Sequence, residues 1–243
     1  FIKSTTKHEK YMLAVLKVLF NEQKKEVLNN LGVKKELITK DNLPATWSFN
    51  KKKWEKLFQE ESDVFYKGIV VDYGKRSLSG LDIAGLSFDV ANPRVEKFIE
   101  RNGVLFGRET QSTAYEALKK QFIEGLKEGE GIPQLADRVS SVYAGYVGDN
   151  PWKAIRIART EIIKSSNFGS LEGYKQSGVV KNKQWISTRD NRTRDDHRVV
   201  DGQSVALDSP FIVGGEELMH PGDPSGSAEQ NINCRCAFKA LIV

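Results

Sequence analysis

The chain has 243 residues, of which 39% are hydrophobic and 28% are charged. That balance is typical of a folded globular protein and excludes an intrinsically disordered chain, and no apolar run approaches the roughly 18 residues that a membrane-spanning helix needs. Its two cysteines are too few for a disulfide scaffold, which favours folding in a reducing, intracellular setting. The sequence begins at Phe1 rather than Met, so we expect the natural start to lie upstream.

The net charge of +5 is concentrated at the N-terminal end. Residues 1–60 contain 13 Lys and Arg against 7 Asp and Glu, whereas residues 61–150 are net negative. A basic segment can attract nucleic acid or an acidic protein surface, but a solvated, lysine-rich helix face explains the pattern more simply. The sequence contains no zinc-finger, RRM or P-loop pattern that would favour nucleic acid.

Apolar residues at spacings of three and four predict two long helices in the first third of the chain. The first covers residues 8–31, and residues 33–50 form a predicted connection. The second helix begins near Lys51, with Ser48 or Asn50 as its N-cap, and runs into the seventies. Its aromatic stripe belongs to the core, because aromatic residues at helical spacing usually pack inward.

Glycine and proline divide the middle of the chain. Residues 74–92 favour loops with a short extended piece. Asn92 followed by Pro93 is a typical helix start, and Gly103 is placed to end that helix. Three more helices are predicted, over residues 109–127, 132–142 and 151–178.

After Gly178 the pattern changes to short alternating segments that are typical of strands. Four strands are predicted, at residues 183–188, 204–207, 211–213 and 236–243. The sequence therefore predicts an α+β fold, in which a long helical N-terminal region precedes a compact C-terminal α+β module with a small, mostly antiparallel sheet. We place the boundary between a helical region at residues 1–104 and a module at residues 105–243.

The stretch from Trp185 to Cys236 holds two of the three histidines and both cysteines. Its acidic residues suit turns and the first turn of a short helix: Asp190, Asp195, Asp196, and Asp201 followed by Gly202. Three arginines would pair with these carboxylates fork to fork: Arg192, Arg194 and Arg235. We favour this structural interpretation, in which the polar residues hold a loop-rich fold together.

A metal site is the second interpretation. Cys234 and Cys236 with His197 offer two thiolates and an imidazole, which are zinc ligands, and His220 or an aspartate would complete the set. The Cys-x-Cys spacing is less typical of structural zinc than Cys-x2-Cys, which keeps this interpretation behind the structural one.

Catalysis is the third interpretation. Either cysteine with His197 could form a nucleophile and base, and Asp190 and Asp201 with His197 could form a hydrolytic site. Nothing in the spacing favours these pairings over the structural interpretation. We therefore assign no catalytic residue and no cofactor other than the zinc considered above.

Arg159 and Glu161 form a polar cluster on an otherwise apolar helix. Residues two apart on a helix do not face each other, so the two side chains cannot pair within the helix. We expect them to tie the helix to residues 185–202.

Three groups of residues occur in an order that is specific when they are taken together. They are Ala158, Arg159, Thr160 and Glu161 with Asn167 and Gly169; Trp185, Asp190, Arg192, Thr193, Arg194, His197, Asp201 and Gly202; and Pro221, Gly222, Asp223 and Pro224 with Asn233, Cys234, Arg235 and Cys236. In this order they resemble the phage head-morphogenesis family, the minor head proteins similar to protein F of phage Mu. The resemblance covers roughly residues 105–240, and the first hundred residues match only in being helical.

The resemblance implies a low-copy virion protein of a tailed phage. Such a protein would associate with the portal or the major capsid protein inside the procapsid and assist head assembly, DNA packaging or delivery. It would occupy the host cytoplasm during assembly and the capsid interior near the portal afterwards, with no membrane partner. Residues 1–104 would dock to portal or capsid, or would contact packaged DNA through their basic helix.

Two alternatives from other classes stay open. One is an enzyme or toxin-like effector carried in the virion, similar to an ADP-ribosyltransferase, with Glu161 in its site. The other is a DNA-binding virion protein.

Overall fold

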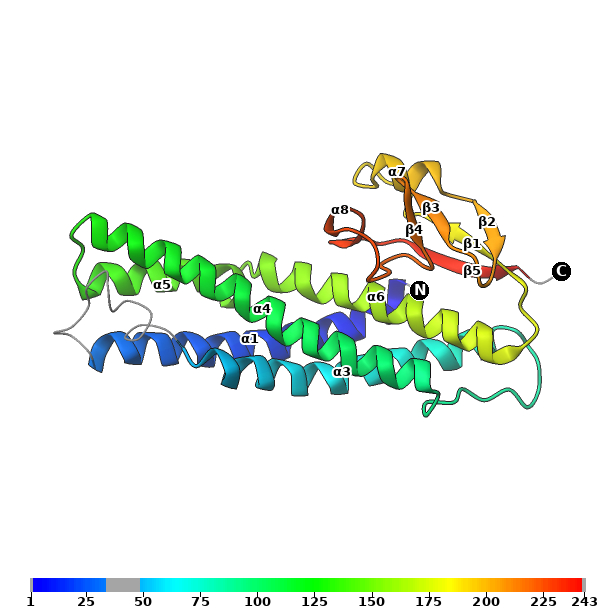
Figure 1. Ribbon diagram of the computed structural model, residues 1–243, viewed down its shortest axis with the longest axis horizontal. Coiled ribbons are helices and arrows are strands. Elements are labelled where there is room, and N and C mark those ends of the chain that lie inside the picture. Colours follow the sequence, from blue (N-terminus) through cyan, green and yellow to red (C-terminus); the bar gives the residue numbers. More distant parts are fainter. Residues whose placement is uncertain (1, 34–48, 242–243) are drawn as a thin grey trace. The chain divides into compact units, whose positions relative to one another are not determined.

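The computed structural model describes residues 2–33 and 49–241 and has the predicted α+β fold (Figure 1). Its helices are α1 (Ile2–Val33), α3 (Lys51–Ser79), α4 (Pro93–Lys127), α5 (Ile132–Val147), α6 (Trp152–Ser177), α7 (Asp195–Val199) and α8 (Ala228–Asn231). Its strands are β1 (Asn182–Ile186), β2 (Ser204–Ala206), β3 (Phe211–Val213), β4 (Glu216–Leu218) and β5 (Ala237–Leu241). None of the described helices is long and apolar enough to cross a bilayer.

The chain divides into two compact units. The strand-bearing unit comprises Phe1–Lys10, Phe65–Ile99 and Arg156–Val243, and the helical unit comprises Tyr11–Val64 and Glu100–Ile155. The predicted boundary between residues 104 and 105 falls inside α4. That boundary concerns the functional division of the chain, and it stays a prediction.

The core of the helical unit is aromatic. Phe20 stacks on Tyr146 with ring centroids 4.0 Å apart, and meets Phe58 edge to face at 5.0 Å. A buried polar group lies in the same unit, where the Tyr143 hydroxyl donates to Gln23 Oε1 at 2.9 Å. The amide of Gln23 in turn donates to Gln111, so this buried glutamine is satisfied on both sides.

The prediction that Gly103 ends a helix is wrong, because α4 continues through it to Lys127. The glycine at this position is needed for close helix packing and does not end the helix. A Cβ at Gly103 would lie 1.9 Å from Asp63 Oδ1, and one at Gly107 would lie 2.4 Å from the carbonyl oxygen of Glu55. Both glycines therefore let α4 approach α3 inside the helical unit.

The strand-bearing unit contains two small antiparallel sheets. One has the strand order β2-β1-β5, with Trp185 opposite Phe238, and the other is the β3-β4 hairpin, with Phe211 opposite Leu218. Trp185 is 1% exposed and meets the ring of Phe211 edge to face at 5.2 Å, which joins the two sheets through one aromatic core. All the strand pairings of the described residues are antiparallel, as predicted.

Helix α6 is packed on α3 and on the strand-bearing segments within this unit (Figure 1). A Cβ at Gly169 would lie 2.6 Å from the carbonyl oxygen of Val70, and one at Gly173 would lie 2.6 Å from that of Gly74. The glycine of the helix motif is thus required by a close helix crossing. On α6, Phe168 also stacks on Phe98 at 3.8 Å.

Most of the other predicted elements are confirmed. Asn92 caps α4 by accepting from the Arg94 amide at 3.0 Å, and Asn50 caps α3 by accepting from the Lys53 amide at 3.1 Å. No strand occurs in residues 74–92, because α3 extends to Ser79 and turns follow it. The sequence did not predict β4 or α8, and the helix predicted over residues 132–142 is too short, because α5 continues to Val147. The greater part of the predicted connection at residues 33–50, including Ser48, lies outside the described residues.

Candidate functional site

Cys234 and Cys236 lie in the turn that leads into β5, and both are buried. The residue before them, Asn233, has a φ of 60°, which turns the chain sharply from the end of α8 toward the strand. The turn points both sulfurs to one side, and the backbone amide of Cys236 donates to Cys234 Sγ at 3.4 Å. An amide directed at sulfur stabilises negative charge on that sulfur.

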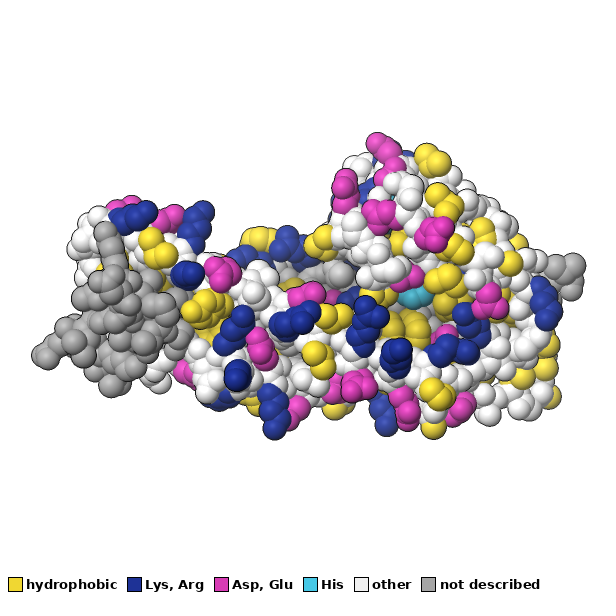
Figure 2. Space-filling model, viewed as in Figure 1, with side chains coloured by type: hydrophobic (Ala, Val, Ile, Leu, Met, Phe, Trp, Pro, Cys, Tyr) yellow, Lys and Arg dark blue, Asp and Glu magenta, His cyan; other side chains and the backbone are white. Residues whose placement is uncertain are grey.

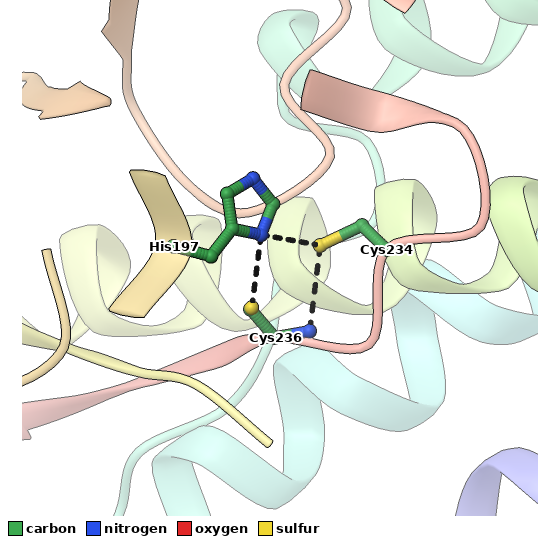
Figure 3. A group of neighbouring side chains, drawn as sticks. All are labelled: His197, Cys234 and Cys236. Carbon is green, nitrogen blue, oxygen red and sulfur yellow. Dashed lines mark hydrogen bonds between the residues drawn. The ribbon is translucent and has the colours of Figure 1, made fainter. Parts of the chain in front are cut away.

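His197 comes from α7 and faces both cysteines (Figure 3). Its Nδ1 atom lies 3.7 Å from Cys234 Sγ and 3.3 Å from Cys236 Sγ. The three residues are 1–2% exposed, and their donor atoms all lie within 4.8 Å of one another. The structure thus brings together the three residues that the sequence named as possible metal ligands, although metal binding itself stays a prediction.

The other nitrogen of His197 is held by an amide relay. Gln230 Oε1 lies 3.0 Å from His197 Nε2, and Gln230 Nε2 donates to Asp196 Oδ2 at 2.9 Å. An ionised carboxylate only accepts hydrogen bonds, so the amide nitrogen of Gln230 must face Asp196 and its oxygen must face the imidazole. In its neutral form His197 therefore carries its proton on Nε2 and turns Nδ1 toward the two sulfurs.

Gly214 makes room for this relay. Its φ of 57° is in the left-handed region, and a Cβ there would lie 2.4 Å from Asp196 Oδ2 and 2.6 Å from Gln230 Nε2. Any side chain at this position would displace the relay. The glycine thus acts on the imidazole through Asp196 and Gln230.

The two thiols differ in acidity. The pKa of Cys234 lies well below its usual range, chiefly because Cys236 donates to its sulfur. The pKa of Cys236 is raised by that same hydrogen bond and by burial.

A fork between Arg235 and Asp190 holds the cysteine turn in place. The guanidinium of Arg235 donates to the two carboxylate oxygens of Asp190 at 2.5 Å and 2.6 Å. This pair, with help from the Arg192 amide and the Thr193 hydroxyl, holds the pKa of Asp190 far below its usual range. Thr188 adds a further contact by donating to the carbonyl oxygen of Arg235 at 3.0 Å.

The structural interpretation of the other polar residues is largely confirmed. Asp201 accepts from the Ser187 amide at 2.8 Å and from Arg189 at 2.6 Å, and Gly202 follows it with a φ of 83°. Arg192 lies 3.7 Å from Asp190. The prediction for Arg194 is wrong, because its guanidinium donates to the carbonyl oxygen of Ile232 instead of to a carboxylate.

Asp190 and Asp201 are thus engaged by arginines, whereas the described partners of His197 are Gln230 and the cysteines. The structure does not assemble the predicted hydrolytic group of His197 with the two aspartates.

The motif residues of α6 hold the same turn from the opposite side. Asn167 is buried and donates to the carbonyl oxygens of Pro221 at 3.0 Å and of Cys236 at 3.1 Å. Asp223 organises the Pro221 loop, because it accepts from the amides of Met219 at 2.7 Å and Ser225 at 2.9 Å. The three motif groups therefore meet in one packed structure.

The expectation for Arg159 and Glu161 is wrong in its details. Arg159 donates to Asn233 Oδ1 at 2.8 Å and to Glu9 at 3.3 Å. Glu161 accepts from the Tyr66 hydroxyl at 2.5 Å and from Lys164 at 2.7 Å. Neither has a described partner among residues 185–202, because the face of α6 that bears them contacts α3, α1 and the cysteine turn instead.

His220 does not join the cluster at His197. It is 2% exposed, its Nδ1 lies 3.1 Å from the carbonyl oxygen of Pro221, and its ring meets Phe168 edge to face. Its carbonyl oxygen accepts from the Asp223 amide at 3.1 Å, so His220 begins a turn.

Sequence reasoning missed Gln230, whose amide sets the tautomer of His197. Ser227 followed three residues later by Gln230 is a capping-box pattern, and the backbone N–H of Gln230 donates to Ser227 Oγ at 3.3 Å. That signal could have found α8. It could not have shown that the side chain reaches His197, which lies 33 residues away along the chain.

The sequence model described as "Phage Mu protein F like protein" matches residues 116–239. The chain belongs to this family. The match includes all three motif groups that carried the resemblance, so that prediction is confirmed.

One of three curated relatives is named as a phage head protein. The chain is 35% identical over 123 residues to the Minor head protein GP7 of Bacillus phage SPP1, covering 49% of this chain and 38% of the relative. It is 33% identical over 124 residues to an NAD(+)--arginine ADP-ribosyltransferase, EFV, of Enterococcus faecalis, covering 49% of this chain and 24% of the relative. It is 23% identical over 197 residues to the Uncharacterized protein YqbB of Bacillus subtilis, covering 78% of this chain and 62% of the relative.

The chain thus spans less than two thirds of the length of these relatives. No solved structure gives a significant match. Membership of the family and homology with a minor head protein support the predicted class, a phage head protein.

Proposed function

We propose that this chain is a minor head protein of a tailed phage that associates with the portal or the major capsid protein inside the procapsid. The observation that carries the proposal is that residues of the family motifs pack around a single turn. Asn167 on α6, the Asp190–Arg235 fork and the Pro221 loop all hold one turn, Asn233 to Cys236. Their contacts build a rigid module, as an assembly protein requires.

The helical region at residues 1–104 is the proposed docking region. On the face shown in Figure 2, basic and acidic side chains are intermingled along the helices. A mixed surface suits contact with another protein, whereas DNA-backbone contacts use a field of one sign. We therefore favour portal or capsid over packaged DNA as the partner of this region.

An ADP-ribosyltransferase-like activity is the second candidate, because one relative carries that name. The segment shared with that relative is 24% of its length, and Glu161 of this chain is 9% exposed, with its carboxylate bonded to Tyr66 and Lys164. A carboxylate held in this way has no open path to a nucleotide. NAD turnover by the purified chain that is lost in Glu161→Gln would revive this candidate.

Co-purification tests the proposed function. The tagged chain would be co-expressed with the portal protein and, separately, with the major capsid protein of the same phage. We expect the portal protein to be retained on the tagged chain and to stay bound in 0.5 M salt. Retention of DNA alone, with a steep decrease as salt rises, would instead favour the DNA-binding alternative.

A further inference from the structure

We propose that His197, Cys234 and Cys236 bind one zinc ion that pins α7 to the turn before β5. The three donor atoms converge from segments 37 and 39 residues apart, and each donor residue is buried. This is the one group of three or more His, Cys, Asp or Glu donors found in the described part of the chain. The proposal does not depend on the partner of the protein in the phage head.

The two sulfur-to-nitrogen separations fit a tetrahedral ion. With Zn–S near 2.3 Å and Zn–N near 2.05 Å, tetrahedral geometry requires an S–N separation of about 3.6 Å. The two observed separations, 3.7 Å and 3.3 Å, lie on either side of that value. Two thiolates and one imidazole are also a donor set that suits zinc over the harder magnesium and calcium ions.

The orientation of His197 suits a metal ligand. Gln230 holds the Nε2 side of the ring, so Nδ1 is the nitrogen that faces the sulfurs and, in the neutral ring, offers its lone pair to an ion. Both sulfurs converge on this one atom. A metal ion bonded to Nδ1 and to both sulfurs accounts for the convergence, and a hydrogen-bond acceptor behind the distal nitrogen, here the side-chain carbonyl of Gln230, is the usual support for a metal-bound histidine.

The turn also prepares the sulfurs to carry charge. The Cys236 amide donates to Cys234 Sγ at 3.4 Å, and the guanidinium of Arg235 is fixed beside the turn by Asp190. Two thiolates neutralise the ion, while Arg235 and Asp190 neutralise each other. The buried site therefore carries no net charge, which burial requires.

Three protein donors leave one tetrahedral position. The described residues supply no fourth His, Cys, Asp or Glu to the cluster. Because the donors are 1–2% exposed, a substrate has no access to the ion, and its role is to tie α7 to the turn before β5.

Metal analysis of the full chain is the direct test. The chain would be purified from cells grown with zinc and analysed by plasma mass spectrometry, and we expect about one zinc per chain. Replacing zinc by Co²⁺ should give a thiolate-to-cobalt charge-transfer band in the near ultraviolet and the intense visible bands of a tetrahedral site. His197→Asn should lose the metal, whereas His8→Asn, far along the chain from the cluster, should keep it.

The relay has its own test. Gln230→Ala should weaken zinc binding by about 10–100-fold in competition with a chromophoric chelator, while the cobalt spectrum keeps its charge-transfer band. Gln176→Ala is the matched control, because Gln176 binds Asp89 and does not contact the cluster. Equal zinc affinities of the two variants would remove Gln230 as a positioning residue.

Two results would overturn the zinc site. One is a chain that contains no metal, takes up none on titration and has both thiols free to form a disulfide or a thiolate–imidazolium pair. The other is a folded His197→Asn or Cys234→Ser variant that still holds one zinc per chain. Should both variants fail to fold, the cobalt spectrum of the unmodified chain decides, since absence of the charge-transfer band contradicts thiolate ligation.

Discussion

Single carboxylates and glycines determine how the cysteine turn is held. Asp190 binds both guanidinium nitrogens of Arg235, and Gly214 leaves the space that Asp196 and Gln230 occupy behind His197. Neither Asp190 nor Gly214 touches a cysteine in the described contacts. Their effect on the cluster is therefore positional, which makes it separable by substitution.

The Asp190–Arg235 fork should make stability depend on acid pH. The folded state holds the pKa of Asp190 below that of the unfolded chain, which is about 3.9. The stabilisation is thus complete above the unfolded pKa and is lost as the pH falls below it. Asp190→Asn should lower the melting temperature by a few degrees at pH 7, and the difference from the unmodified chain should shrink toward pH 3.

Asp195→Asn is the control for that series. Asp195 pairs with Arg198 at 2.9 Å, but its side chain is 92% exposed, and exposed pairs contribute little. Thermal melts of both variants between pH 3 and pH 7 make the comparison. An Asp195→Asn effect as large as that of Asp190→Asn would show that the fork has no special role.

Lys183 gives a second prediction, in the alkaline range. Its side chain is buried in β1, donates to the carbonyl oxygen of Met219 at 2.7 Å and lies over the Phe211 ring. Burial lowers its pKa to about 8, so between pH 8 and pH 10 the unfolded chain binds more protons than the folded one. Stability contributed by this residue should therefore rise with pH, by about 1.4 kcal/mol for each unit by which the pKa is lowered.

Chemical denaturation between pH 7 and pH 10 measures this rise. The increase should disappear in Lys183→Met and persist in Lys181→Met, since Lys181 is an exposed lysine of the same segment. A rise that is equal in the two variants would assign the effect to other groups.

At the scale of elements, glycines set how closely the helices pack. In the helical unit, Gly107 brings α4 against the backbone of Glu55 on α3. Gly107→Ala should cost about 1–3 kcal/mol, because the clash is with backbone that cannot rotate away. Gly68→Ala is the matched control, since a Cβ at that exposed glycine would meet nothing within 4 Å outside its own helix, and it should gain up to about 1 kcal/mol from helix propensity. Urea denaturation of both variants measures the free energy of unfolding, which should fall in Gly107→Ala and rise in Gly68→Ala.

How much of the structure the sequence predicts depends on whether each sequence pattern acts locally or through contacts between distant segments. Helical periodicity and caps are local, so α3, α6 and the start of α4 were predicted from their own residues. Gly103 was wrongly predicted to end a helix. A glycine that ends a helix and a glycine that lets two helices pack closely look the same in the sequence until the partner helix is known. Strand β4 is three residues long and carries two glutamates, which leaves no alternating pattern to find.

The candidate site divides in the same way. The types and spacing of His197, Cys234 and Cys236 sufficed to name them as a possible cluster. The role of Gln230 and the partners of Arg159 and Glu161 depend on contacts between distant segments, and no periodicity encodes them.

At the scale of the whole molecule, three features fit a structural protein of a phage head. They are the family assignment, the packing of the motif residues and the proposed zinc ion. The chain belongs to the phage Mu protein F-like family, and its motif residues are used to hold a turn rather than to line an open cleft. We propose that the strand-bearing module is rigid and that the helical region carries it to the portal or capsid.

The most direct test of the proposed function is to quantify the chain in purified procapsids by mass spectrometry. Particles would be assembled in cells that express the chain with the capsid, scaffold and portal proteins of the same phage, and in matched cells without the portal protein. We predict that the chain sediments with complete procapsids at a few copies per particle and falls to background when the portal is omitted. A chain that is absent from procapsids in both cases, while particles assemble normally without it, would contradict the account.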